Sequence, residues 1–329
     1  MSGSDETCSA TVSVALCITV SLGTPSFAGI PATSVVTSTR EVVAGDYDDR
    51  EGYRSDFLGE RFEVSLPQVS RATDDVLTFD DNGRQASVLR YKHFSVVMSR
   101  SRRMCFLSAC NIDGRLSKKS ARAAWKWDPR IPQAQQIMHE CYGNPPKFSR
   151  GHMTRREDPG WGGDVEVARR GNEDSMHVTN TVPQMQAFNA PIWLALEDYS
   201  LQHARQDEMH ISVFTGPFFS THDRAMYGVL IPVAFWKVIA FIHDDTGRLC
   251  ATGYQMDQKD QLPSAEFVYG EFDSPQLSVA TQVPIAAIAE RAGIDFGRLV
   301  DVDPLAGRHE EGVGATAPLQ ALEQIRFLR

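Results

Sequence analysis

The stretch FSRGHMTRREDPGWG, residues Phe148–Gly162, is the part of the chain from which the rest can be interpreted. Within it, His152 follows a glycine and has three arginines close in sequence, Arg150, Arg155 and Arg156. Neighbouring cations lower the pKa of an imidazole and keep it neutral, as a general base requires. A single histidine is more often structural than catalytic, so this stretch by itself indicates only a candidate site.

A second informative block, HVTNTVPQMQAFNAPIWLALE, covers His177–Glu197. Asn180 lies among mixed polar and apolar residues, whereas Asn189 precedes Pro191 and a run with helical spacing. By default such an asparagine is an N-cap, and Glu197 is a solvated helix charge. Because about two helical turns separate Asn189 from Glu197, we nevertheless expect them on similar sides of one helix.

Together, the two blocks resemble the DNA/RNA non-specific endonucleases of the ββα-metal superfamily, the group that contains the Serratia nuclease and mitochondrial endonuclease G. Ser149–His152 match the family signature Asp-Arg-Gly-His, and Thr179–Gln184 match its Thr-Asn-x-x-Pro-Gln motif. Asn189, Trp193 and Glu197 match the asparagine, tryptophan and glutamate of its metal-bearing helix. Several motifs in the family's order are not expected by chance.

The resemblance extends over Val88–Pro304, because FTGPFF (Phe214–Phe219) and IPVAFWKVI (Ile231–Ile239) also match strand motifs of the family. It implies an α+β, ββα-metal nuclease fold with a central antiparallel sheet flanked by helices. The activity that it implies is metal-dependent hydrolysis of phosphodiester bonds in DNA, RNA or both.

The family's chemistry implies a role for each matched residue. His152 would be the general base that activates water for in-line attack on a phosphodiester. Asn189 would be the protein ligand of one Mg²⁺, with Mn²⁺ as a substitute, and Glu197 would hold metal-bound water, which suits an ion that dehydrates reluctantly. Asn180 would support the histidine and its hairpin. Arg150 would bind a phosphate, because a planar guanidinium fits two oxygens.

Two positions leave alternatives open. Ser149 stands where the family usually has aspartate, and exonuclease-type relatives also carry serine there. The chain is therefore an endonuclease, an exonuclease-type variant or a binding-only protein that has lost activity. For the arginine that the family has on the preceding strand, Arg103 is the candidate and Arg102 aligns almost as well. A Ser–His hydrolase is not favoured, since no GxSxG motif surrounds Ser149.

The charge of the chain is unevenly distributed. It has 33 Lys and Arg against 42 Asp and Glu, a net charge of −9, yet Arg90–Arg156 hold 15 basic and 3 acidic residues. Clustered cations with nearby aromatic residues are typical of a phosphate-backbone contact, although they could also neutralise the acidic remainder of the molecule. The candidate nucleic-acid contacts are Arg102, Lys118, Lys119, Arg155 and Arg156.

Runs of β-branched and aromatic residues predict the strands. Val88–Ser99 and Met104–Gly114 flank the basic turn Arg100–Arg103, so an antiparallel hairpin is expected. His210–Pro217 and Leu230–Ile242 are expected to be buried strands.

Helices are predicted at three places, and residues 115–150 are predicted to be a long connection. Asn189–Arg205 has the best helical pattern of the chain. Gln282–Ala292 is a short helix with Gly293 near its C-terminal cap, and Pro318–Arg329 is a terminal helix.

The ends of the chain differ in composition from its centre. We expect a leader or flexible arm over residues 1–45, the nuclease domain over 46–305, and a C-terminal tail with a short helix over 306–329. Localisation stays open between cytoplasmic and exported, since residues 1–28 could act as a signal peptide but begin with acidic residues. No apolar run is long enough to span a membrane, and the six cysteines form no zinc pattern. The expected partners are DNA or RNA, with a homodimer and an inhibitor also open.

Overall fold

In the computed structural model, the described residues are 43–143, 147–185, 209–258, 281–306 and 317–318. All of them belong to the compact unit Val42–Arg329. The metal-bearing helix predicted at Asn189–Arg205 lies outside the described residues, as does nearly all of the terminal helix predicted at Pro318–Arg329. The boundaries proposed at residues 45 and 305 stay predictions.

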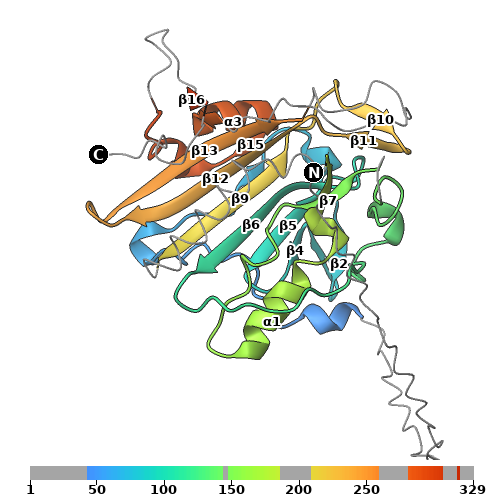
Figure 1. Cartoon of the computed structure of the whole chain (residues 1–329), viewed down its shortest axis with the longest axis horizontal. Coiled ribbons are helices and arrows are strands. Elements are labelled where there is room, and N and C mark those ends of the chain that lie inside the picture. The colour runs from blue at the N-terminus through green and yellow to red at the C-terminus, as the bar shows by residue number, and fades with distance from the viewer. Residues whose placement is uncertain (1–42, 144–146, 186–208, 259–280, 307–316, 319–329) are drawn as a thin grey trace, which may run out of the picture. The chain divides into compact units, whose positions relative to one another are not determined.

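The centre of the described fold is an antiparallel sheet of eight strands in the order β16-β14-β13-β12-β9-β6-β5-β4 (Figure 1). The predicted antiparallel sheet is therefore confirmed. Its strands are β4 (Val88–Arg90), β5 (Phe94–Met98), β6 (Cys105–Asp113), β9 (His210–Pro217), β12 (Ala234–His243), β13 (Arg248–Asp257), β14 (Thr281–Val283) and β16 (Ala317–Pro318).

The hairpin expected around the basic turn is formed by β5 and β6, with Phe94 opposite Cys110. The predicted strand Val88–Ser99 is wrong in one respect, because it is split into β4 and β5. His93, the last residue of the break, has a left-handed backbone with φ of 69°. The predicted strand Leu230–Ile242 is likewise divided at Pro232, since proline has no N–H to donate to a ladder.

Both faces of the sheet are covered by apolar side chains. Phe235 and Trp236 are consecutive in β12 and belong to two different core clusters, as expected for alternating side chains. Phe148 and Val182, from the segment that carries the histidine signature, pack in the first cluster. The second cluster contains Ile285 of helix α3. This double coverage explains why the central strands β6, β9 and β12 are mostly buried.

Two α-helices lie in the described part of the chain. Helix α3 (Ile285–Ala292) follows Pro284 and ends at Gly293, whose φ is 66°, so the predicted C-cap is confirmed. The predicted start at Gln282 is wrong, because Thr281–Val283 form strand β14. The sequence analysis did not find helix α1 (Val165–Asp174). Its N-cap Asp164 accepts a hydrogen bond from the Val167 backbone N–H at 2.8 Å. Helix α1 has no long apolar stripe, which is the signal that predicts helices best.

Short elements complete the described fold. Paired two- to four-residue strands are β1 (Gln68–Val69) with β15 (Ile294–Asp295), β2 (Phe79–Asp81) with β3 (Arg84–Ala86), β7 (Ser149–His152) with β8 (Thr181–Gln184), and β10 (Arg224–Met226) with β11 (Val229–Ile231). The 3₁₀ helices are η1 (Ala44–Tyr47), η2 (Glu60–Phe62), η3 (Thr73–Asp75), η4 (Gln133–Gln135), η5 (Val178–Asn180) and η8 (Gly297–Val300). Apart from η4, residues 115–143 form the predicted long connection. Among the described helices, none has the length and apolar character needed to cross a membrane.

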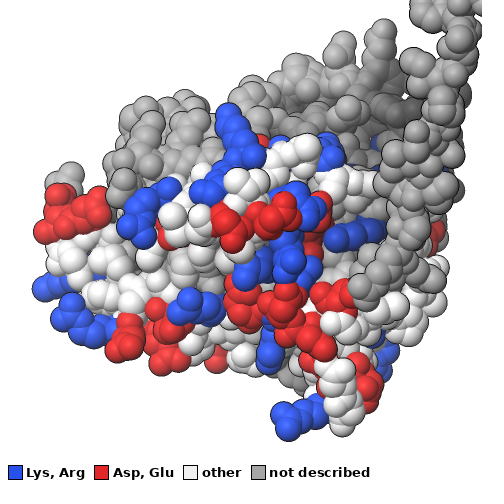
Figure 2. Space-filling view, turned by 90° about the horizontal axis from the view of Figure 1, so that it is seen from below, with Lys and Arg blue, Asp and Glu red and all other residues white. Residues whose placement is uncertain are grey.

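Charges of both signs are interleaved on the face of the molecule seen in Figure 2. Several basic side chains also form ion pairs with acidic ones. On α1, Arg169 forms ion pairs with Glu166 and Glu173, and Arg170 forms one with Asp49. Exposed pairs of this kind contribute little stability, but they neutralise the cations that they contain.

Candidate active site

The histidine signature lies on a two-stranded hairpin. β7 pairs with β8 in antiparallel register, with His152 opposite Thr181 and Ser149 opposite Gln184. The side chain of Gln184 crosses Gly151, where an added Cβ would lie only 2.1 Å from its atoms. Any larger residue at position 151 would therefore force the Gln184 side chain to move.

The hairpin borders a pocket of about 580 Å³ with a basic lining. Six of the lining residues are Arg122, Trp125, Arg150, His152, Arg155 and Arg156. Arg122 and Arg150 have no carboxylate partner within the described ranges; both guanidinium groups lie over the Trp125 ring, at 5.7 and 5.5 Å from its centroid. Their positive charge is therefore available to an anion in the pocket.

His152 has the features of an available base. Its Nε2 atom is buried and has no hydrogen-bond partner among the described residues, although the residue as a whole is half-buried. The Trp125 ring lies against it, with 4.8 Å between ring centroids. Burial, followed by the charges of Arg122, Arg156 and Arg155, lowers its pKa to about 3. At neutral pH the imidazole is thus uncharged, which is the protonation state in which a general base acts.

Asn180 binds the backbone immediately after His152. Its Oδ1 accepts from the Thr154 N–H and its Nδ2 donates to the Thr154 carbonyl, both at 2.8 Å. Nδ2 also donates to the Ser175 carbonyl at 3.0 Å, so the buried amide is fully bonded. The Asn180 carbonyl accepts from the Met153 N–H at 2.9 Å. This geometry holds the end of β7 at a fixed place beside η5.

The predicted arginines are divided between two environments. Arg150 lines the pocket, donates to the Met138 carbonyl, and has its pKa lowered by burial. Neither Arg102 nor Arg103 is among the residues that line it. Arg102 forms a 2.8 Å ion pair with Asp223, whose side chain is inaccessible to solvent.

Arg103 donates to the Gln136 carbonyl at 2.6 Å and is paired with Glu140. The segment that contains these two residues also includes Met138, the acceptor of Arg150, so the two arginines bind the same segment. A phosphate-binding role for Arg102 or Arg103 stays a prediction.

The remaining basic candidates also differ in position. Arg155 and Arg156 line the pocket, and Arg156 is paired with Glu157 at 2.9 Å. Lys118 and Lys119 do not line it: Lys118 is half-buried and Lys119 exposed, on the connection that leads to Arg122. The structure therefore brings Arg150, His152, Arg155 and Arg156 together around one pocket and leaves the lysines outside it.

Comparison with known proteins identifies the family. A family model described as DNA/RNA non-specific endonuclease matches residues 73–303. The chain belongs to this family. A curated relative, the uncharacterized protein y4fB of Sinorhizobium fredii (strain NBRC 101917 / NGR234), is 39% identical over 280 residues. The match covers 80% of this chain and 41% of y4fB, so the chain spans less than half of that relative.

Among solved structures, a chain from the EndoG/EndoGI complex is also similar. Its sequence identity is 19% and its TM-score 0.48, over 67% of this chain and 88% of the other.

The predicted metal-site residues of this family member cannot be placed within the described residues. Asn189 and Glu197 both lie outside them. The described residues contain no group of three or more His, Cys, Asp or Glu side chains that could hold an ion. The predicted ligand, a single asparagine, stays a prediction.

Sequence reasoning missed two pocket residues of this family member, Arg122 and Trp125. Trp125 lies 27 residues before His152 in the sequence, and no spacing rule relates the two. The only available signal was the alternation of tryptophans with basic residues along the connection.

Proposed function

We propose that this chain is a metal-dependent nuclease that hydrolyses phosphodiester bonds of DNA, RNA or both without reading the base sequence. The observation that carries this proposal is the buried, unpartnered Nε2 of His152 in a pocket bordered by four arginines. A neutral nitrogen beside cations suits proton abstraction from water next to a phosphate, and membership of the endonuclease family supports the same reaction.

His152 acts as the general base in this proposal. Its lowered pKa keeps the imidazole neutral, so that it can take the proton of the attacking water. Asn180 holds the backbone of Met153 and Thr154, which fixes the position of the ring relative to the pocket. Arg150 and Arg122 bind the phosphate oxygens, since neither has a carboxylate partner within the described ranges.

Asn189 is the residue that would hold the ion, with Glu197 holding its bound water. An amide oxygen and a carboxylate are hard oxygen donors, which suit Mg²⁺ and also Mn²⁺. The unpartnered Nε2 of His152 fits this arrangement because it leaves an acceptor for a water molecule. When bound, the ion would stabilise the leaving oxygen and the charge that develops at phosphorus.

Ser149 bears on the mode of cleavage. It lines the pocket at the position where the family usually has aspartate, so it supplies a hydroxyl instead of a carboxylate. An exonuclease-type activity is the second candidate because of this substitution. A binding-only protein is less well supported, since binding needs neither a neutral buried imidazole nor its amide clamp. A homodimer and a protein inhibitor remain predictions.

The decisive experiment compares closed-circular plasmid, linear duplex DNA and RNA as substrates, with Mg²⁺, Mn²⁺ or a chelator. Cleavage of the closed circle identifies an endonuclease, and cleavage of linear substrates alone identifies an exonuclease. The matched controls are His152→Ala and His222→Ala, since His222 is exposed and does not line the pocket. Nucleic-acid binding without cleavage under every metal condition would show that the proposal is wrong.

A further inference from the structure

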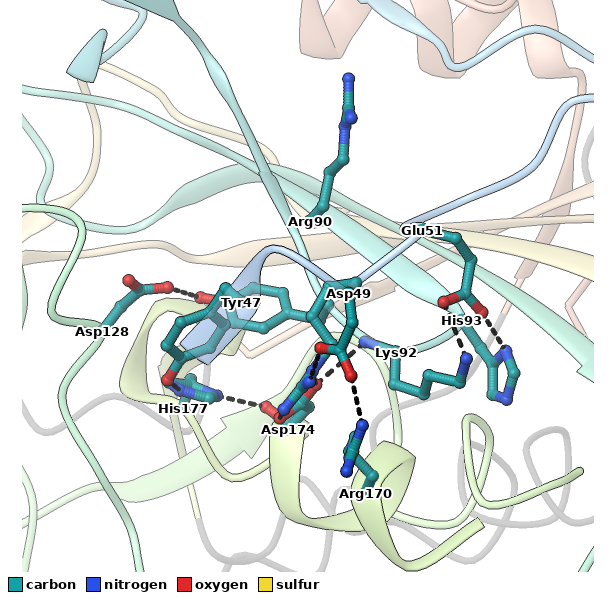
Figure 3. Close-up of polar contacts among 12 residues, drawn as sticks. Tyr47, Asp49, Glu51, Arg90, Lys92, His93, Asp128, Arg170, Asp174 and His177 are labelled. Carbon is teal, nitrogen blue, oxygen red and sulfur yellow. Dashed lines mark hydrogen bonds and ion pairs between the residues drawn. The ribbon is translucent and has the colours of Figure 1, made fainter. Parts of the chain in front are cut away.

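Tyr47, in the 3₁₀ helix near the start of the described chain, is part of a buried polar network that also includes His177 (Figure 3). Its side chain is buried, and its hydroxyl lies 2.5 Å from Nε2 of His177. The Nδ1 of His177 lies 2.6 Å from the Asp174 carbonyl. A carbonyl only accepts, so Nδ1 carries the proton, Nε2 is the acceptor, and the Tyr47 hydroxyl donates.

The protonation states of both groups agree with this assignment. Burial lowers the pKa of His177 to about 4, so its ring is neutral and has one acceptor nitrogen. Burial also raises the pKa of Tyr47, so the phenol keeps its proton and can donate.

His177 is directly connected to the turn that carries Asn180. It is the N-cap residue of η5, and its carbonyl accepts from the Asn180 N–H at 3.0 Å. Asn180 in turn binds both backbone groups of Thr154 and the N–H of Met153, the two residues that follow His152. A continuous series of hydrogen bonds thus connects Tyr47 to the end of β7.

The ring of Tyr47 has a separate set of contacts. The Arg130 guanidinium lies 4.2 Å from its centroid, and the Tyr91 ring meets it edge-on at 6.1 Å. Removing the hydroxyl alone should leave these ring contacts in place. A phenylalanine at this position therefore isolates the hydrogen bond to His177.

We infer that Tyr47 is a positioning residue for His152, because its hydroxyl orients His177 and thereby the turn from which Asn180 clamps Met153 and Thr154. The inference rests on the proposed function, in which His152 is the base. The positioning residue, Tyr47, lies 130 residues before His177 in the sequence.

The test is Tyr47→Phe, with Tyr53→Phe as the matched control. The Tyr53 hydroxyl donates to the Val64 carbonyl at 2.8 Å, and its ring packs with the second core cluster, opposite the hairpin. Tyr47→Phe should lower kcat by about 10-fold, with KM changed by less than about twofold, because one buried hydrogen bond is lost without any contact to substrate. Tyr53→Phe should leave kcat unchanged. Equal losses in the two variants, or full kcat in Tyr47→Phe, would overturn the inference.

Amide hydrogen exchange tests the same inference without any activity. In Tyr47→Phe the Met153 and Thr154 amides should exchange about 10-fold faster than in the wild type, since their acceptors are both on Asn180. If Tyr47→Phe does not fold, His177→Gln serves as the second variant with the same expected results. Faster exchange in a chain without nuclease activity would contradict only the proposed function. Unchanged exchange and kcat in an active nuclease would contradict only the inference.

Discussion

His177 and the Nε2 atom of His152 are both buried, but the ring nitrogens of the two residues differ in hydrogen bonding. The pKa is lowered to about 3 for His152 and to about 4 for His177, in each case chiefly by burial. Both nitrogens of His177 are bonded, one to Tyr47 and one to the Asp174 carbonyl. Nε2 of His152 has no partner within the described ranges. A lowered pKa therefore does not identify a base; an unpartnered nitrogen in a pocket is the distinguishing feature.

The arginines around the two histidines also differ, in whether they are paired with carboxylates. In the His177 network, Arg130 is paired with Asp128 at 2.6 Å and Arg50 with Asp174 at 2.5 Å. In the pocket, Arg122 and Arg150 have no carboxylate partner among the residues described. Pairing makes the first set structural, whereas the second set keeps its charge for a ligand.

The largest expected effect separates the two histidines directly. His152→Ala should lower kcat by about 10²–10⁴-fold, the usual cost of losing a general base, with little change in the free energy of unfolding. His177→Ala should lower kcat far less, as expected for Tyr47→Phe, and should also lower the free energy of unfolding by roughly 2–4 kcal/mol, because Tyr47 loses its buried acceptor. Steady-state kinetics and urea denaturation measure the two quantities. A His152→Ala enzyme with more than half of the wild-type rate would remove His152 from the mechanism.

The pH dependence of stability sharpens the comparison for His177. Its pKa is about 4 in the folded protein and near the ordinary value of 6.5 in the unfolded chain. Between these values only the unfolded chain binds the proton, so the free energy of unfolding should fall as the pH falls, by up to about 3 kcal/mol. Urea denaturation from pH 7.5 to 4.5 checks this. His177→Gln, which cannot titrate, should show a weaker dependence, and identical curves would contradict the assignment.

Metal titration tests the predicted metal ligand, Asn189. Asn189→Ala should raise the Mg²⁺ concentration needed for half-maximal activity by more than Glu197→Ala does. For Glu197→Ala a rise of about 10–100-fold is expected, which is typical of losing a residue that only holds a ligand of the metal. The cause is that a direct ligand loses a coordination bond, whereas Glu197 loses only the orientation of bound water. Activity against Mg²⁺ concentration gives both values. Wild-type titrations in both variants would mean that the ion is bound elsewhere.

The smallest effect concerns the lysines outside the pocket. Replacing Lys118 and Lys119 with alanine should weaken binding equally for unrelated sequences and flatten the log–log salt slope by about 0.9 per lost duplex phosphate contact. Binding is measured in a His152→Ala background so that cleavage does not distort it. The matched comparison is Arg122→Ala, which removes a cation from the pocket itself. An unchanged slope in the double variant would restrict phosphate contacts to the pocket.

Local sequence patterns predicted much of the fold but not all of it. The hairpin of β5 and β6 and the cap at Gly293 were found because they depend on residues adjacent in sequence. Helix α1 was missed because hydrogen bonds of Asp164 and ion pairs of Arg169, not an apolar stripe, are its local signals. The break at His93 depends on backbone conformation that β-branched composition does not reveal.

Motif matching predicted His152, Asn180 and Arg150 as site residues, and the structure places Arg150 and His152 at one pocket. It could not determine what Arg102 contacts, because its partner Asp223 lies 121 residues later in the chain. The same holds for Trp125, whose contact with His152 depends on the path of the long connection.

The sequence by itself determined the family and located the central strands between Val88 and Ile242, but it predicted neither β13 nor β14 and did not predict the pairing of β7 with β8. Only the tertiary structure decided which of the two histidines keeps an unpartnered nitrogen and which cations stay unpaired. The physical reason is that burial and hydrogen bonding are set by neighbours in space. For His177 the hydroxyl that satisfies the ring comes from Tyr47, 130 residues away, and the fold alone brings the two together.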